Sequence, residues 1–78
     1  MPNLQAELDD LQLADKHVLQ AEAALARLEN AKANGVPFGE TEQTLLDAAR
    51  ESLVQFRKHR DLIVQTIADI RAGRLPST

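Results

Sequence analysis

Cysteine, tryptophan and tyrosine are absent from this 78-residue sequence, and phenylalanine occurs only twice. Without cysteine the chain can form no disulfide and no thiolate metal site of the zinc-finger type. Without stacking aromatics it lacks the usual platform for single-stranded nucleic acid, and a formal net charge of −3 further disfavours such binding. A chain this short buries only a modest core when it folds alone. Self-association is therefore the expected reinforcement.

Long apolar runs are also missing. No stretch approaches the roughly 18 residues that span a bilayer. The first residues, Met-Pro-Asn-Leu-Gln-Ala-Glu, have neither the basic start nor the apolar segment of a signal peptide. The sequence therefore predicts a cytoplasmic protein that makes no contact with a membrane.

Signatures of catalysis are missing as well. The sequence has no Gly-rich phosphate loop, no Ser or Lys in a recognisable nucleophile motif, and none of the Glu-x-x-His pairs of di-iron bundles. We interpret the protein as non-enzymatic.

The residues that are abundant are helix formers, chiefly Ala, Leu, Glu, Gln, Arg and Asp. From residue 4 to residue 33 there is no Gly or Pro, and apolar residues recur at steps of three and four. They are Leu4, Leu8, Leu11, Ala14, Val18, Ala21, Leu25 and Leu28. This pattern predicts one amphipathic helix over about 4–34, with Asn3 as its N-cap and Asn34-Gly35 at its end.

A second helix is predicted over about 41–72, after a turn at 35–40. Thr41 is its expected N-cap, and Gly73 its stop. The same spacing defines its apolar face, which comprises Leu45, Leu46, Ala49, Leu53, Phe56, Ile63, Ile67 and Ile70. Residues 73–78 are expected to form a frayed tail, and residues 1–78 a single domain.

The short turn forces the two helices to run antiparallel. If the turn is centred near residue 38, facing residues have numbers that add up to about 76, which places Leu25 opposite Ser52 or Ala49. Apolar residues then meet apolar residues along nearly the whole length. The predicted fold class is all-α, a coiled-coil-like two-helix antiparallel hairpin.

Two paired helices make a slab, which cannot cover both of its own sides. Several apolar residues fall outside the two stripes: Leu13, Leu19, Val54, Leu62 and Val64. The simplest closure is a symmetric homodimer in which two hairpins form a four-helix bundle, although a higher homo-oligomer is also compatible with the pattern. The same residues are candidates for contact with a different protein.

The two histidines, His17 and His59, are expected to face each other near the middle of the hairpin. A two-fold axis could bring four imidazoles together, where they could hold a transition metal or small ligand, with Asp15 or Glu22 as a further ligand and Arg60 at the edge. The interpretation that we favour is a polar layer without any cofactor, in which His17, His59, Ser52 and Thr66 fix register and oligomeric state.

A basic strip is formed in the sequence by Arg50, Arg57 and Lys58, at helical spacing. Such a strip could bind structured RNA or another phosphate-bearing ligand. Acidic residues at Asp47 and Glu51 interrupt it, so we expect no nucleic acid as the main partner.

Four landmarks carry a resemblance to a known group: Asp15-x-His17, Gly35, Thr41-Glu42-x-x-Leu45-Leu46 and His59-Arg60-Asp61-x-Ile63. Over residues 15–63 the chain resembles a group of short proteobacterial helical-hairpin proteins of unknown function. The resemblance implies a bacterial origin and a helical hairpin, and it brings no activity and no ligand set.

Three hypotheses follow. The main one is a small non-enzymatic protein that associates with itself and binds or inhibits a partner protein. The second is a metal-binding or ligand-binding bundle built on the two histidines. The third is structured-RNA binding through the basic strip.

Overall fold

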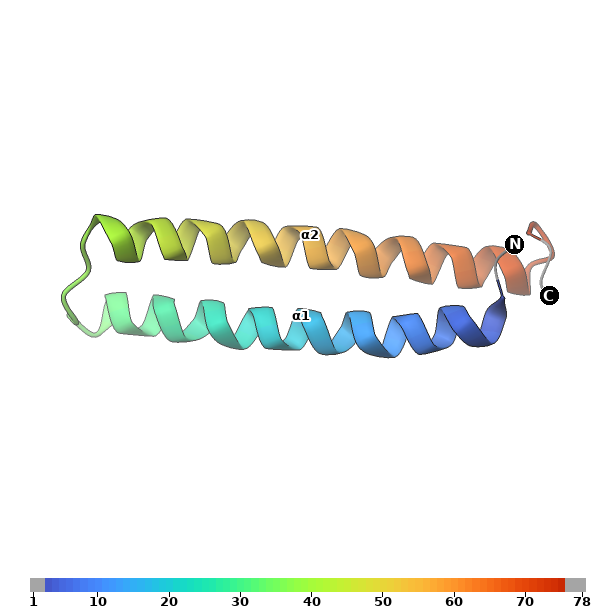
Figure 1. The fold of residues 1–78 in the computed structure, drawn as a ribbon, viewed down its shortest axis with the longest axis horizontal. Helices are drawn as coiled ribbons and strands as arrows, with labels where there is room; N and C mark the ends of the chain where they lie inside the picture. The colour runs from blue at the N-terminus through green and yellow to red at the C-terminus, as the bar shows by residue number, and fades with distance from the viewer. Residues whose placement is uncertain (1–2, 76–78) are drawn as a thin grey trace.

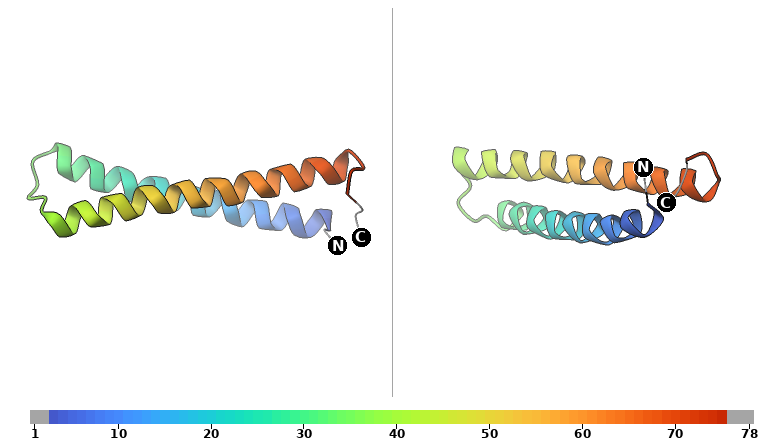
Figure 2. Two further views of the ribbon diagram at one scale, coloured as in Figure 1. Left: turned by 90° about the horizontal axis from the view of Figure 1, so that it is seen from above. Right: turned by 45° about the vertical axis from the view of Figure 1, so that its right-hand side comes forward.

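The protein is a hairpin of two long α-helices, seen here in a computed structural model that describes residues 3–75. Helix α1 spans Leu4–Ala33 and helix α2 spans Glu40–Arg71. The two helices lie side by side and run antiparallel, so the turn occupies one end of a rod of 53 × 16 × 15 Å (Figure 1). Seen from above, they cross each other along their length (Figure 2). The predicted all-α hairpin is confirmed.

Helix α1 begins at the predicted cap. Asn3 has an extended backbone, and its side-chain Oδ1 accepts a hydrogen bond from the backbone N–H of Ala6 at 3.2 Å. This bond satisfies one of the amides that the first turn leaves without a partner. Glu7 lies in that turn, where a negative charge is favourable next to the positive end of the helix dipole.

Helix α1 also ends where the sequence predicts, at Asn34-Gly35. Gly35 has a φ of 76°, which places it in the left-handed region. This conformation lets the N–H of Val36 reach back to the carbonyl of Ala31 at 3.1 Å, the long bond of a Schellman motif. A residue with a Cβ would be strained here, so the glycine determines where the turn begins.

The start of helix α2 differs from the prediction. Thr41 is not the N-cap, because the helix begins one residue earlier, at Glu40, and Gly39 takes the cap position. The carboxylate of Glu42 accepts a hydrogen bond from the N–H of Gly39 at 3.0 Å. Glu42 thereby occupies the third helical position, as the glutamate of a capping box does, and this determines where the helix starts.

The end of helix α2 repeats the left-handed cap, with Gly73 at a φ of 76°. The N–H of Arg74 donates to the carbonyl of Asp69 at 2.8 Å, and the N–H of Leu75 donates to the same oxygen at 3.3 Å. The expectation of a frayed tail is therefore wrong for residues 73–75, because hydrogen bonds hold them to the helix. The rest of that tail lies outside the described residues.

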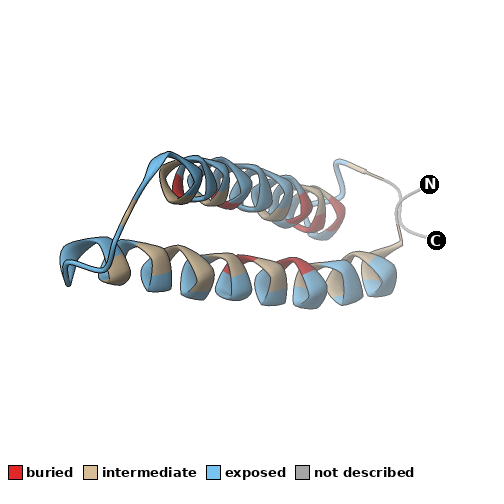
Figure 3. Ribbon diagram, turned by 60° about the vertical axis from the view of Figure 1, so that its left-hand side comes forward, coloured by how far each residue is buried: buried red, intermediate tan, exposed pale blue. Residues whose placement is uncertain are grey.

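The core is a single seam between the helices (Figure 3). Its buried residues are Ala14, Val18, Leu46, Leu53, Ile63, Ile67 and Ile70. Leu4, Leu8 and Leu11 pack, partly buried, against the part of the seam near the free end of the hairpin. The seam follows the predicted apolar stripes with two exceptions. Leu45 is exposed, because Leu46 takes the inward position, and Phe56 lies at the edge of the seam.

Contacts between the helices lie on either side of the predicted register. On one side of the seam His17 stacks on Phe56, and on the other side Glu22 pairs with Arg57. The residue numbers of these pairs add up to 73 and 79, whereas the predicted sum is about 76.

Candidate functional site

The seam divides the hairpin surface into two flanks of different chemistry. Residues that directly follow an inward-facing residue lie on one side of each helix, and residues that directly precede one lie on the other side. The first set, which we name the charged flank, contains Asp15, Glu22, Glu29, Arg50, Arg57 and Arg71, with the apolar Val64 among them. In the second set, the positions next to the seam over residues 13–24 and 45–66, which we name the uncharged flank, are His17, Ala24, Leu45, Ser52, His59 and Thr66.

Ion pairs between the helices line the charged flank. Arg50 Nε lies 3.8 Å from Glu29 Oε1, and Arg57 Nη2 lies 3.5 Å from Glu22 Oε2. Two residues of the predicted basic strip therefore face carboxylates of α1. The third, Lys58, follows Arg57 and turns away from this flank by about 100°. An RNA phosphate would have to compete with the carboxylates for both guanidinium groups.

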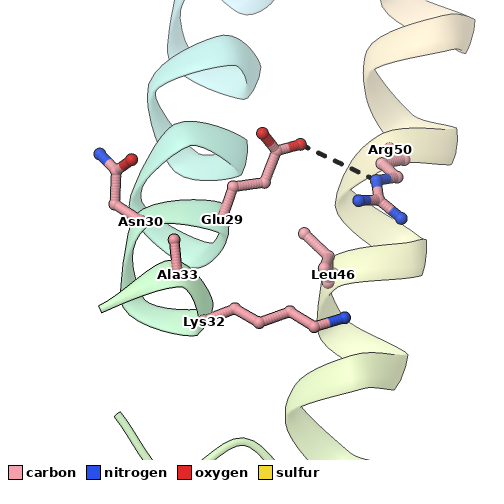
Figure 4. A pocket seen from close by; sticks show the side chains of 6 residues that line it. All are labelled: Glu29, Asn30, Lys32, Ala33, Leu46 and Arg50. Carbon is pink, nitrogen blue, oxygen red and sulfur yellow. Dashed lines mark ion pairs between the residues drawn. The ribbon is translucent and has the colours of Figure 1, made fainter. Parts of the chain in front are cut away.

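An open hollow lies on the same flank near the turn (Figure 4). It is lined by Glu29, Asn30, Lys32, Ala33, Leu46 and Arg50. The Glu29–Arg50 pair crosses it, and the side chain of Lys32 extends across from α1 to α2 below Leu46. Lys32 Nζ donates to Gln43 Oε1 at 2.8 Å and lies 5.4 Å from the centroid of the Phe38 ring. The charged groups around this hollow thus form polar contacts between the two helices.

The two histidines have different surroundings. His17 is half-buried, and its ring stacks at a tilt on Phe56 with 5.4 Å between the ring centroids. His59 is exposed. Arg60 takes the inward position at that level, which places His59 on the uncharged flank.

The other members of the predicted metal or ligand set are spread over the surface. Asp15 and Glu22 lie on the charged flank, on the opposite side of α1 from His17. Arg60 pairs with its neighbour Asp61, at 3.2 Å, and not with Asp15. Across residues 3–75, no three His, Asp or Glu side chains are grouped so that they could hold a metal ion. Metal binding stays a prediction that a metal analysis must test.

The apolar residues predicted to lie outside the seam are all exposed. They are Leu13, Leu19, Val54, Leu62 and Val64. Sequence reasoning missed Leu45 as a member of this set. The signal for it was present: Leu45 and Leu46 are neighbours, so both cannot face inward, and the spacing through Ala49 and Leu53 selects Leu46.

Comparison with protein-family models, with curated proteins and with solved structures finds no match to this chain. The resemblance to short proteobacterial proteins therefore stays a prediction. Within residues 3–75, neither helix combines the length and the apolar character that a membrane span requires.

Proposed function

We propose that this protein is a non-enzymatic interaction module, which associates with itself into a four-helix bundle and acts by binding a partner protein. The observation that carries the proposal is the set of large apolar side chains left exposed by the hairpin. In addition to the five predicted residues, Val36, Leu45 and Phe56 are exposed. They lie on both flanks and at the turn, so apolar surface is available on more than one side of the hairpin for contact with another helix.

The surface area of the hairpin supports self-association. The chain exposes 5459 Å², whereas a compact monomer of 8.6 kDa is expected to expose about 4,700 Å². The excess is roughly 750 Å², close to the ~800 Å² that each partner buries in a standard protein–protein interface. The hairpin thus has more surface than a compact chain of its mass, and self-association would bury part of that surface.

The seam by itself buries little apolar surface. Several inward positions carry alanine, such as Ala14, Ala21 and Ala49, and each alanine buries little apolar surface. A second layer of helices would cover the sides of the seam and bury the half-exposed ring of Phe56. Four-helix bundles close in this way, with each helix in contact with two neighbours.

The experiment that tests the proposal is the solution mass at neutral pH, measured by size-exclusion chromatography with light scattering, with and without a chelator. We expect twice the chain mass of 8.6 kDa under both conditions. A monomer at every concentration would contradict self-association. A dimer that separates when chelator is added would instead favour a metal at the histidines, and the metal content of tag-free protein would then identify it.

A further inference from the structure

The uncharged flank is more extensive than its six defining residues. The next positions outward on the same side of each helix are Leu13, Gln20, Ala48, Gln55 and Leu62. Together with the uncharged flank, they form a surface that has no Asp, Glu, Lys or Arg over residues 13–24 of α1 and 45–66 of α2. The charged residues of this stretch of the hairpin lie on the charged flank, on the outer side of the helices, or, for Arg60, in the seam. The free-energy cost of desolvation is therefore much higher for the charged flank than for the uncharged flank.

Burying the charged flank would desolvate Arg50, Arg57 and their glutamate partners, and the desolvation of ion pairs often costs more than their attraction returns. Burying the uncharged flank removes mainly methyl, methylene and ring groups from water. Depletion of charge together with an aromatic residue is the composition found at the centre of protein interfaces. Phe56, stacked on His17, supplies the aromatic group here.

We infer that the uncharged flank is where a second copy of this chain docks. This inference rests on the proposed function and names the face that carries it. Small side chains at Ala24 and Ser52, at the same level on the two helices, let the second hairpin approach closely.

Charge at the ends of the flank indicates how the second copy is oriented. On α1 the surface is bordered by Asp10 at one end and by Arg27 at the other, both exposed and on the same side of the helix. The two residues lie at nearly equal distances from the middle of α1. A copy that runs in the reverse direction therefore places Asp10 of each chain beside Arg27 of the other, which is an isologous two-fold contact.

A matched pair of leucines tests which face is used. Leu62 borders the uncharged flank and Leu19 borders the charged flank, and their exposures in the hairpin are nearly equal, 68% and 67%. We expect Leu62→Glu to weaken the dimer at least about tenfold in Kd and Leu19→Glu to change it by less than about twofold. Sedimentation equilibrium measures both, with helicity by circular dichroism as a check on folding.

The absence of cysteine allows a second test that leaves the fold intact. Ser52→Cys places a thiol on the uncharged flank, and Ala26→Cys places one beside the charged flank; both positions are exposed in the hairpin. As the protein concentration is raised through the dimer Kd, alkylation of Cys at position 52 should slow at least about tenfold, while alkylation at position 26 should stay constant.

The outcomes answer two separate questions: whether the chain associates with itself, and which face it uses. Wild-type protein that stays monomeric overturns the proposed function. A dimer in which position 26 is protected, or in which Leu19→Glu is the disruptive variant, leaves self-association standing and overturns the choice of face.

The orientation of the second copy has its own test. Asp10→Arg should weaken the dimer, and the double variant Asp10→Arg with Arg27→Asp should restore it. Failure of that rescue overturns the reversed arrangement.

Discussion

Arg57 of α2 lies 3.5 Å from Glu22 of α1, and seven residues further along each helix the pair recurs as Arg50 and Glu29. Seven residues are almost two helical turns, so the same contact returns at the same side of the seam. Opposite charges repeated at this spacing disfavour a helix that slips along its partner by one turn, because the basic residues would lose their acidic partners. The charged flank thus helps to determine the register of the hairpin.

The first prediction concerns these ion pairs. In a double-mutant cycle, replacing Glu22 and Arg57 by alanine should give a coupling free energy of about 0.2–1 kcal/mol, because both side chains are about half exposed. Urea denaturation at low salt measures the coupling, and it should shrink in 1 M salt. A charge-swapped variant, Glu22→Arg with Arg57→Glu, serves as the control and should recover most of the stability. Coupling that does not respond to salt would argue against an exposed pair.

The second prediction concerns the core. Leu46 is fully buried, so Leu46→Ala should lower the free energy of unfolding by about 2–5 kcal/mol. For so small a domain, this loss would abolish most of the helical signal at room temperature. Leu19→Ala, at an exposed position on the other helix, should change stability by no more than about 0.5 kcal/mol. Equal losses for the two variants would contradict the placement of Leu46 in the seam.

The third prediction concerns Arg60, a charged residue in an inward position. Its side chain is 36% exposed, and its ion pair is with the adjacent Asp61. Arg60→Leu should continue the apolar seam between Leu53 and Ile67 and raise the thermal midpoint, with a gain of about 1 kcal/mol. Thermal unfolding followed by circular dichroism measures the midpoint. A lower midpoint would show that the arginine contributes more through its charge than leucine would through burial.

The fourth prediction concerns the cap at the end of α2. Hydrogen bonds from Arg74 and then Gln65 hold the pKa of Asp69 below the usual value for an aspartate. Since the folded pKa is the lower one, this contribution to stability is complete above the unfolded pKa, about 3.9. It is lost as the pH falls through the folded pKa.

Carboxyl titration by NMR tests this prediction directly. Arg74→Ala should raise the pKa of Asp69 the most, and Gln65→Ala should raise it by less. Arg71→Ala, which removes a nearby charge without removing a hydrogen bond to Asp69, should have the smallest effect. An unchanged pKa in the Arg74 variant would contradict the geometry of the cap, in which Arg74 Nη2 lies 2.7 Å from Asp69 Oδ1.

Local features of the fold followed from neighbouring residues in the sequence. Asn3 and Gly35 were predictable as caps because each acts on amides or carbonyls within a few residues of itself. The start of α2 was not, because Thr41 and Glu42 offer competing caps and only the folded turn shows that the carboxylate of Glu42 reaches the N–H of Gly39. The tail was misjudged because Gly73 permits either a frayed end or a left-handed cap.

Composition and periodicity by themselves determined that the chain is helical, that it is a hairpin, and that Leu13, Leu19, Val54, Leu62 and Val64 lie outside the seam. Such properties depend on a period of 3.6 residues and a short turn, both of which are local. Only the tertiary structure decided which residues face inward where two candidates are adjacent, as with Leu45 and Leu46, or His59 and Arg60. That choice depends on how each helix is rotated about its own axis, because adjacent residues point about 100° apart. The same rotation places the charged flank and the uncharged flank on opposite sides of the seam.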